Sequence, residues 1–174
     1  YYYAVTRRII QQGKKRSNFE DAEIGLNLWA KYMHSFGLGQ KLETDITGLR
    51  AGSIPDAAYY DKWYGHHRWA FSTIRSISIG QGEVMLTPLH MANIAAIIAN
   101  RGWYITPHFV KSIGKNRPLP EFRKKHYAMV ESRHYATIVE GMRRVVHEPG
   151  GTGKRAQLKD IIVCGKTGTV QNPH

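Results

Sequence analysis

Residues 165–169, with the sequence Gly-Lys-Thr-Gly-Thr, carry the side chains best suited to chemistry in this chain. They follow a short apolar run that favours an extended strand. On a strand, Lys166 supplies a fixed ammonium group, and Thr167 and Thr169 supply hydroxyl groups. Gly168 has no side chain, so the backbone of a ligand can lie against the strand edge. The pattern predicts a strand that binds a small anionic peptide.

The triplet Gly-Lys-Thr is also the end of a phosphate-binding P-loop. That motif needs a glycine at position 160, where this chain has Asp160, and a carboxylate there would repel phosphate. No helix signal follows Lys166, although a P-loop lysine opens a helix. A second Gly-rich segment, residues 150–154, is followed by Arg155 in place of the metal-binding hydroxyl, which favours a turn. The sequence therefore argues against a nucleotide site.

The composition predicts one globular unit or part of one. The chain has 174 residues, 42% of them hydrophobic, which is ordinary for a packed domain. Its formal net charge of +12 attracts anions of any kind. The basic residues form short scattered groups, which favours a solvated surface. A basic nucleic-acid-binding module, with ten tyrosines available for stacking, is the alternative from another functional class.

Cysteine and histidine give no sign of a metal, a cofactor or a disulfide. The lone Cys164 cannot form an intrachain disulfide, which leaves the cellular compartment open. Its position in the apolar run predicts a small core residue rather than a nucleophile. His66 and His67 have no spaced Cys, Asp or Glu partners, so we predict neither a metal site nor a cofactor.

Hydrophobic spacing predicts helices in the first part of the chain. We expect one over residues 1–12. A second begins at a capping box formed by Ser17 and Glu20 and runs to residue 36. A stripe on this second helix is expected to face the core: Ile24, Leu28, Tyr32 and Phe36.

The remainder predicts a long excursion and two more helices. Residues 37–71 are rich in Gly, Pro and aromatics and predict a surface loop. Thr87 caps a helix over residues 89–99, which we expect to be buried on most sides because it has little polar surface. Residues 103–113 favour an edge strand or extended loop, and residues 132–147 favour a helix.

Short segments along the chain carry a second, longer pattern. They are Phe-Gly-Leu-Gly at 36–39, Thr-Asp-Ile at 44–46, Gly-Ser-Ile-Pro-Asp at 52–56, Ser-Ile-Gly-Gln-Gly at 78–82 with Thr87 and Pro88, Asn-Arg-Gly at 100–102 with Pro107 and His108, and Gly-Thr-Gly at 151–153. With the Lys-Thr-Gly element, this order and spacing resembles class B penicillin-binding proteins, specifically the cell-elongation type, penicillin-binding protein 2. The resemblance covers essentially the whole chain.

The resemblance implies an α+β fold of the penicilloyl-serine transferase type, also called β-lactamase/transpeptidase-like. This chain would supply mainly the helical part plus the Lys-Thr-Gly strand. The implied activity is that of a peptidoglycan D,D-transpeptidase, which cross-links stem peptides through an acyl-serine intermediate and is acylated by β-lactam antibiotics. The alternative is a β-lactamase or β-lactam sensor of the same fold. Whether the acyl-enzyme is hydrolysed or persists would distinguish the alternatives.

The resemblance also implies roles for the site residues. Lys166 would place positive charge beside the second active-site serine and attract the substrate carboxylate. Thr167 and Thr169 would bind that carboxylate through their hydroxyls. The Thr169 backbone amide would donate to the oxyanion, and Gly168 would keep the strand edge clear for antiparallel docking of the substrate.

The family's other motifs are not found. The only Ser-x-x-Lys string joins Ser112 to Lys115, and Gly114 favours a turn there, so the two side chains would not share a helical face. No Ser-x-Asn string occurs. We therefore expect residues 1–174 to be an incomplete transpeptidase domain that lacks both upstream motifs and the strands after Lys-Thr-Gly, and to be inactive alone.

By the same resemblance, the parent protein would be anchored in the cell inner membrane with its catalytic domain on the periplasmic side. Its partners would be peptidoglycan stem peptides, β-lactams, membrane proteins of the elongation machinery and a glycan polymerase. Nucleic acid is not among them.

Overall fold

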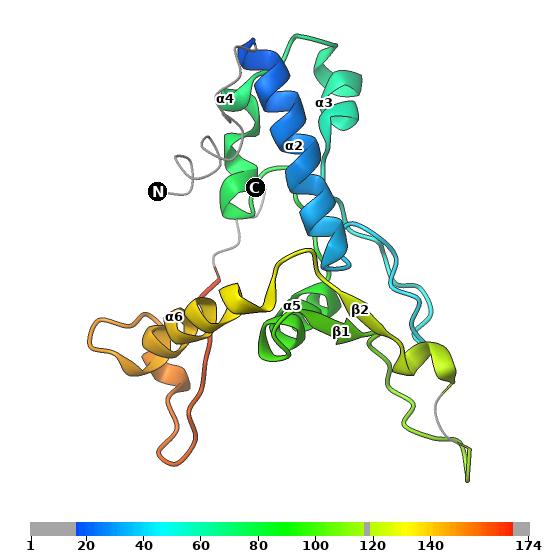
Figure 1. Ribbon diagram of the computed structural model, residues 1–174, viewed down its shortest axis with the longest axis vertical. Helices are drawn as coiled ribbons and strands as arrows, with labels where there is room; N and C mark the ends of the chain where they lie inside the picture. Colours follow the sequence, from blue (N-terminus) through cyan, green and yellow to red (C-terminus); the bar gives the residue numbers. More distant parts are fainter. Residues whose placement is uncertain (1–16, 117–118, 169–174) are drawn as a thin grey trace.

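The computed structural model describes residues 17–116 and 119–168 (Figure 1). The helices are α2 (Asn18–Ser35), α3 (Ala57–Tyr64), α4 (Phe71–Ile74), α5 (Pro88–Ala99) and α6 (Tyr135–His147). Short 3-10 helices are η1 (Arg75–Ile79), η2 (Pro120–Arg123), η3 (Ser132–His134) and η4 (Lys154–Ala156). The strands are β1 (Trp103–Ile105) and β2 (Lys125–Tyr127). The helix expected over residues 1–12 lies outside the described residues, as does Thr169.

Helix α2 begins at the predicted capping box. The Ser17 hydroxyl accepts a hydrogen bond from the Glu20 backbone N–H at 3.2 Å. In return, the Ser17 backbone N–H donates to the Glu20 carboxylate at 2.9 Å. The helix ends at Ser35, and Gly37 follows with a φ of 77°, a conformation that favours glycine. Both predicted ends of this helix are confirmed.

The predicted core face of α2 is wrong at Ile24, although Phe36 at its end packs against the core as expected. Ile24 is 45% exposed, whereas the buried side chains are those of Ala22, Leu26 and Ala30. Both stripes have four-residue spacing, so the pattern alone fits either face. Ala22 and Leu26 pack against residues of α3 and α4, whereas Ala30 packs against Leu38 and Ile54. This packing selects the buried face.

The excursion predicted over residues 37–71 contains helix α3, which the sequence interpretation missed. Asp56 caps this helix, and its carboxylate accepts the Tyr59 backbone N–H at 2.8 Å. Tyr60 is completely buried, and its hydroxyl donates a 2.6 Å hydrogen bond to Glu83. Burial raises the pKa of Tyr60, and the hydrogen bond to Glu83 raises it further. The aromatic residues of this region therefore build core and not only surface.

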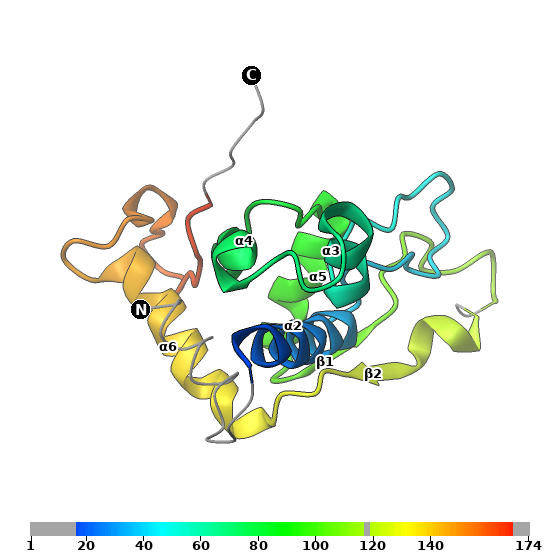
Figure 2. The ribbon, with the colours of Figure 1, turned by 90° about the horizontal axis from the view of Figure 1, so that it is seen from above.

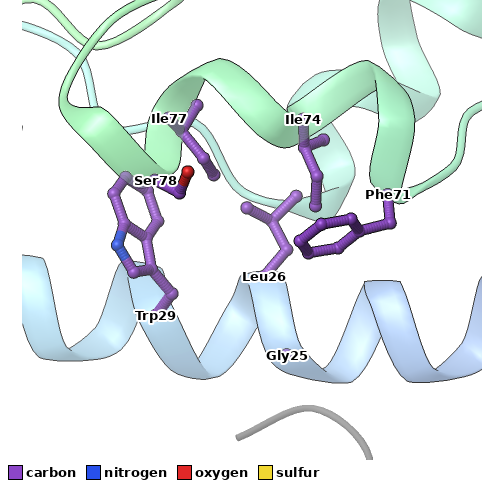
Figure 3. A pocket seen from close by; sticks show the side chains of 7 residues that line it. All are labelled: Gly25, Leu26, Trp29, Phe71, Ile74, Ile77 and Ser78. Atoms are coloured by element: carbon purple, nitrogen blue, oxygen red, sulfur yellow. The ribbon is translucent and has the colours of Figure 1, made fainter. Parts of the chain in front are cut away.

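A main hydrophobic core lies between α2, α3 and α4. Figure 3 shows Leu26 and Trp29 of α2 directed toward Phe71, Ile74 and Ile77 around a small apolar pocket. Burying a Leu or Ile side chain in such a core stabilises the fold by roughly 1.5–3 kcal/mol. The indole of the buried Trp69 donates to Asp61 at 2.7 Å, closing the same cluster. Hydrogen bonds from Trp69 and His66 lower the pKa of Asp61.

Helix α5 starts as predicted, but it is buried on one face only. The Thr87 hydroxyl accepts from the His90 backbone N–H, and Pro88 occupies the first turn. His90, Asn93 and Ile97 are buried, whereas Met91 is 56% exposed. Expected burial on most sides is therefore wrong within the described residues, because they cover only one side of this helix.

Strand β1 pairs with β2 in an antiparallel ladder, with Tyr104 opposite His126. The extended segment predicted over residues 103–113 is confirmed as a strand only to Ile105, and Pro107 follows, which cannot donate to a ladder. The partner strand β2 was not predicted. The pair packs beside α5, where Tyr104 joins Ile97 and Tyr135 in a second buried cluster.

The helix predicted over residues 132–147 is confirmed as η3 followed by α6. Figure 2 shows α6 standing to one side of α2, α3 and α4, with the chain after it looping out and then passing close to the end of α6. Among the described residues, no helix is both long and apolar enough to cross a membrane.

Candidate active-site segment

Residues 161–168 form no strand, so the strand predicted here is corrected. A strand is defined by pairing, and the described residues place no other strand beside this segment. Because no neighbouring strand covers the segment, the side chains of Ile161 and Ile162 are 63% and 73% exposed. Cys164 is also exposed, so its prediction as a core residue is wrong.

The segment is held by hydrogen bonds to α6 and to the turn that follows it. The Val163 backbone N–H donates to His147 Nε2 at 3.1 Å. The Gly165 backbone N–H donates to the Met142 carbonyl oxygen at 3.1 Å. Residues 163 and 165 are half-buried while their neighbours are exposed, the alternation expected of an extended chain with one edge on a support.

A turn after α6 brings a hydroxyl to the segment. The Gly153 backbone N–H donates to the Val145 carbonyl oxygen at 2.8 Å, which folds the chain over the last turn of α6. At Gly151, a side-chain carbon would collide with the same carbonyl oxygen, so glycine is required there. Between them, the Thr152 hydroxyl lies 3.1 Å from the Thr167 hydroxyl. The segment 150–154 is thus a turn, as predicted, that contacts the candidate site.

Ion pairs hold the end of α6 that supports this turn. Arg143 donates to Glu140 at 2.8 Å and to Glu148, just before the turn, at 2.9 Å. Arg144 donates to Glu140 at 2.9 Å. The hydrogen bonds from Arg143 and Arg144 lower the pKa of Glu140 to about 2. Glu140 therefore stays ionised throughout the physiological pH range.

Lys166, Thr167 and Gly168 are all exposed on the last part of the segment. The Lys166 ammonium donates to the Thr167 carbonyl oxygen at 2.7 Å, which leaves two of its three donors for other partners. A side-chain carbon at Gly168 would meet nothing within 4 Å. The surface beside Gly168 is therefore open, and the group offers a cation, a hydroxyl and bare backbone to an anionic peptide.

The Ser112 to Lys115 string forms a tight turn, in agreement with its rejection as a nucleophile motif. The backbone groups of Ile113 and Asn116 exchange hydrogen bonds of 3.3 and 3.1 Å, and Gly114 has a φ of 60°. A serine and a lysine across such a turn do not share a helical face.

The adjacent histidines belong to the packing around α2. His66 Nδ1 lies 3.0 Å from an Asp61 carboxylate oxygen, and the His67 ring stacks on Phe19. Within residues 17–116 and 119–168, no cluster of three or more His, Cys, Asp or Glu side chains could hold a metal ion.

A family model described as the penicillin binding protein transpeptidase domain matches residues 4–173. The chain belongs to this family. Among curated relatives, it is similar to peptidoglycan D,D-transpeptidase MrdA from Acinetobacter baumannii, with 29% identity over 154 residues. That alignment covers 86% of this chain and 22% of the relative. The transpeptidase-family chain therefore spans less than a quarter of the length of that relative.

Solved structures agree with this membership. A complex between penicillin-binding protein 2 and MreC from Helicobacter pylori superposes with a TM-score of 0.72 at 23% identity, covering 99% of this chain and 28% of the other. A second structure, titled as the structural coordination of polymerization and crosslinking by a peptidoglycan synthase complex, gives a TM-score of 0.64 at 27% identity. That match covers 79% of this chain and 22% of the other chain. The transpeptidase-family chain thus has part of the penicilloyl-serine transferase fold, mostly its helical elements.

Sequence reasoning missed two residues that support the candidate site, His147 and Thr152. The Gly-Thr-Gly triplet at 151–153 does signal a tight turn that carries a hydroxyl. No local pattern relates that hydroxyl to Thr167, because the contact depends on how the chain returns along α6.

Proposed function

We propose that this chain is part of an elongation-type peptidoglycan D,D-transpeptidase. The observation that carries the proposal is the group formed by Lys166, Thr167 and Gly168, held on α6 in a chain that belongs to the transpeptidase family. Similarity to a curated relative named peptidoglycan D,D-transpeptidase supports the choice of reaction.

In the proposed reaction, a serine oxygen attacks the carbonyl carbon of the penultimate D-Ala of a stem peptide. The bond to the terminal D-Ala breaks, and the amine of a neighbouring stem peptide then displaces the serine. A β-lactam would acylate the same serine. Because Ser112 and Lys115 lie on a turn, we place the nucleophile outside residues 1–174, which makes this chain an incomplete domain.

The site residues would bind and orient the substrate. The Lys166 ammonium attracts the terminal carboxylate and adds positive charge beside a second serine. Thr167 and Thr169 donate hydroxyl hydrogen bonds to that carboxylate, and the Thr169 backbone N–H donates to the oxyanion. The open surface beside Gly168 admits the peptide backbone, which pairs with the segment as an added strand.

The parent protein would work outside the cytoplasm, anchored in the inner membrane. Its partners would be membrane proteins of the elongation machinery and a glycan-polymerising enzyme. Support comes from the relatives, one of which is solved with MreC and another within a peptidoglycan synthase complex.

Labelling with a fluorescent penicillin tests the proposal. The full gene product, meaning residues 1–174 with whatever flanks them in the gene, should give a covalent band after denaturing electrophoresis. Residues 1–174 alone should give none. Lys166→Ala in the full gene product should slow labelling, on the order of a hundredfold, because a charge aimed at the reacting group is lost. Absence of labelling in the full gene product would contradict the proposal, and rapid release of the label would indicate a β-lactamase instead.

A further inference from the structure

Thr152 touches a proposed substrate-binding side chain without belonging to the Lys-Thr-Gly segment. Its hydroxyl oxygen is 3.1 Å from that of Thr167, and the two residues are 15 positions apart. Thr152 is held in place by the turn around it. The Gly153 backbone N–H donates to the Val145 carbonyl oxygen, and the backbone of Gly151 packs closely against that same oxygen. The contact is therefore set by α6 and its turn.

The direction of this hydrogen bond matters for the chemistry. A hydroxyl group has one proton to donate and can accept two hydrogen bonds. A carboxylate only accepts, so Thr167 can bind it only with its own proton. When Thr167 donates to a carboxylate, it is free to accept, and Thr152 can only act as the donor. Chains of donors polarise one another, so Thr152 would strengthen the bond from Thr167.

We propose that Thr152 is a positioning residue, which orients the Thr167 hydroxyl and its proton toward the carboxylate of the substrate or β-lactam. This role rests on the proposed transpeptidase function. Thr152 does not contact the reacting atoms, and it acts through Thr167 alone.

A double-mutant cycle on the full gene product tests this role, with the second-order rate constant of acylation by a fluorescent penicillin as the measurement. Thr152→Val removes the hydroxyl at nearly constant shape and should slow acylation on the order of threefold to tenfold, the range for one lost hydrogen bond. Thr152→Ser keeps the hydroxyl and should restore the rate. In a Thr167→Val background, Thr152→Val should have no further effect, because the partner is already absent.

Thermal melting separates this role from a general loss of structure. Thr152→Val should melt close to the unsubstituted protein, and Thr152→Ala provides a second hydroxyl deletion with the same expected rate. If the unsubstituted gene product is acylated but Thr152→Val reacts at the same rate, the role of Thr152 is overturned and the proposed function stands. Equal slowing by Thr152→Val in both backgrounds would also overturn it. If the unsubstituted protein is not acylated, both the function and this role are wrong.

Discussion

The carboxylate of Asp45 accepts a 2.8 Å hydrogen bond from the backbone N–H of Val110, 65 residues further along the chain. Both of its oxygens also accept from the Phe109 backbone N–H, each at 3.0 Å. The side chain thus ties the loop after α2 to the segment after β1. These bonds lower the pKa of Asp45, with the one from Val110 contributing most.

Acid should loosen this tie. The pKa of Asp45 is lower in the folded protein than in the unfolded chain, so ionised Asp45 stabilises the fold above its unfolded pKa of about 4. That contribution is lost as the pH falls through the folded value. We expect Asp45→Asn to reduce stability at neutral pH and to flatten the acid limb of a plot of Tm against pH. An unchanged acid limb would contradict this assignment.

The buried hydroxyl of Tyr60 should contribute to stability through Glu83. Tyr60→Phe leaves the Glu83 carboxylate without its 2.6 Å donor, and we expect a cost of about 1–2 kcal/mol in the free energy of unfolding. Urea titration of the full gene product measures it. Tyr64→Phe, on the exposed end of the same helix, is the matched control and should change stability by less than about 0.5 kcal/mol. Equal effects would exclude a special role for the Tyr60 bond.

Two glycines near the site should respond oppositely to alanine. Gly151→Ala places a carbon against the Val145 carbonyl oxygen, so the turn must shift, and we expect both lower stability and slower acylation. Gly141 lies inside α6 with open space where a side chain would begin. Gly141→Ala should therefore stabilise the helix by about 0.5–1 kcal/mol. Melting curves of both variants check the contrast, and a gain in stability from Gly151→Ala would contradict the structure of the turn.

The hydrogen bond from Val163 to His147 should fix the position of the candidate segment. His147→Leu removes the acceptor, and we expect acylation of the full gene product to slow by roughly threefold to tenfold. His147→Gln keeps an acceptor oxygen on a side chain of similar length and should retain most of the rate. If both variants react at the unsubstituted rate, the bond does not position the segment.

Features set by neighbouring residues were predictable from the sequence. The capping box at Ser17 and the N-cap at Thr87 need only side chains close in the sequence, and both form as predicted. The Gly114 turn follows from the same kind of local preference. The roles assigned to Lys166, Thr167 and Gly168 come from their residue types and from the family resemblance, and they stay a prediction.

Features set by distant residues were not predictable in this way. The spacing on α2 fits two faces, and only packing against α3 and α4 decides that Leu26 is buried and Ile24 exposed. Helix α3 was hidden by its aromatic residues, although Asp56 was a usable cap signal. The pairing of β1 with β2 and the contact of Thr152 with Thr167 both require chain returns that no short pattern encodes.

The support of residues 161–168 has a mechanical consequence. Their hydrogen bonds to the rest of the described chain go to α6 and the turn that follows it, at Met142, His147 and Thr152. A tilt of α6 would therefore move the attachment points of the segment that carries Lys166 and Thr167. A force that a bound ligand exerts on Lys166 would in turn be transmitted to α6 before it was transmitted to the core between α2, α3 and α4.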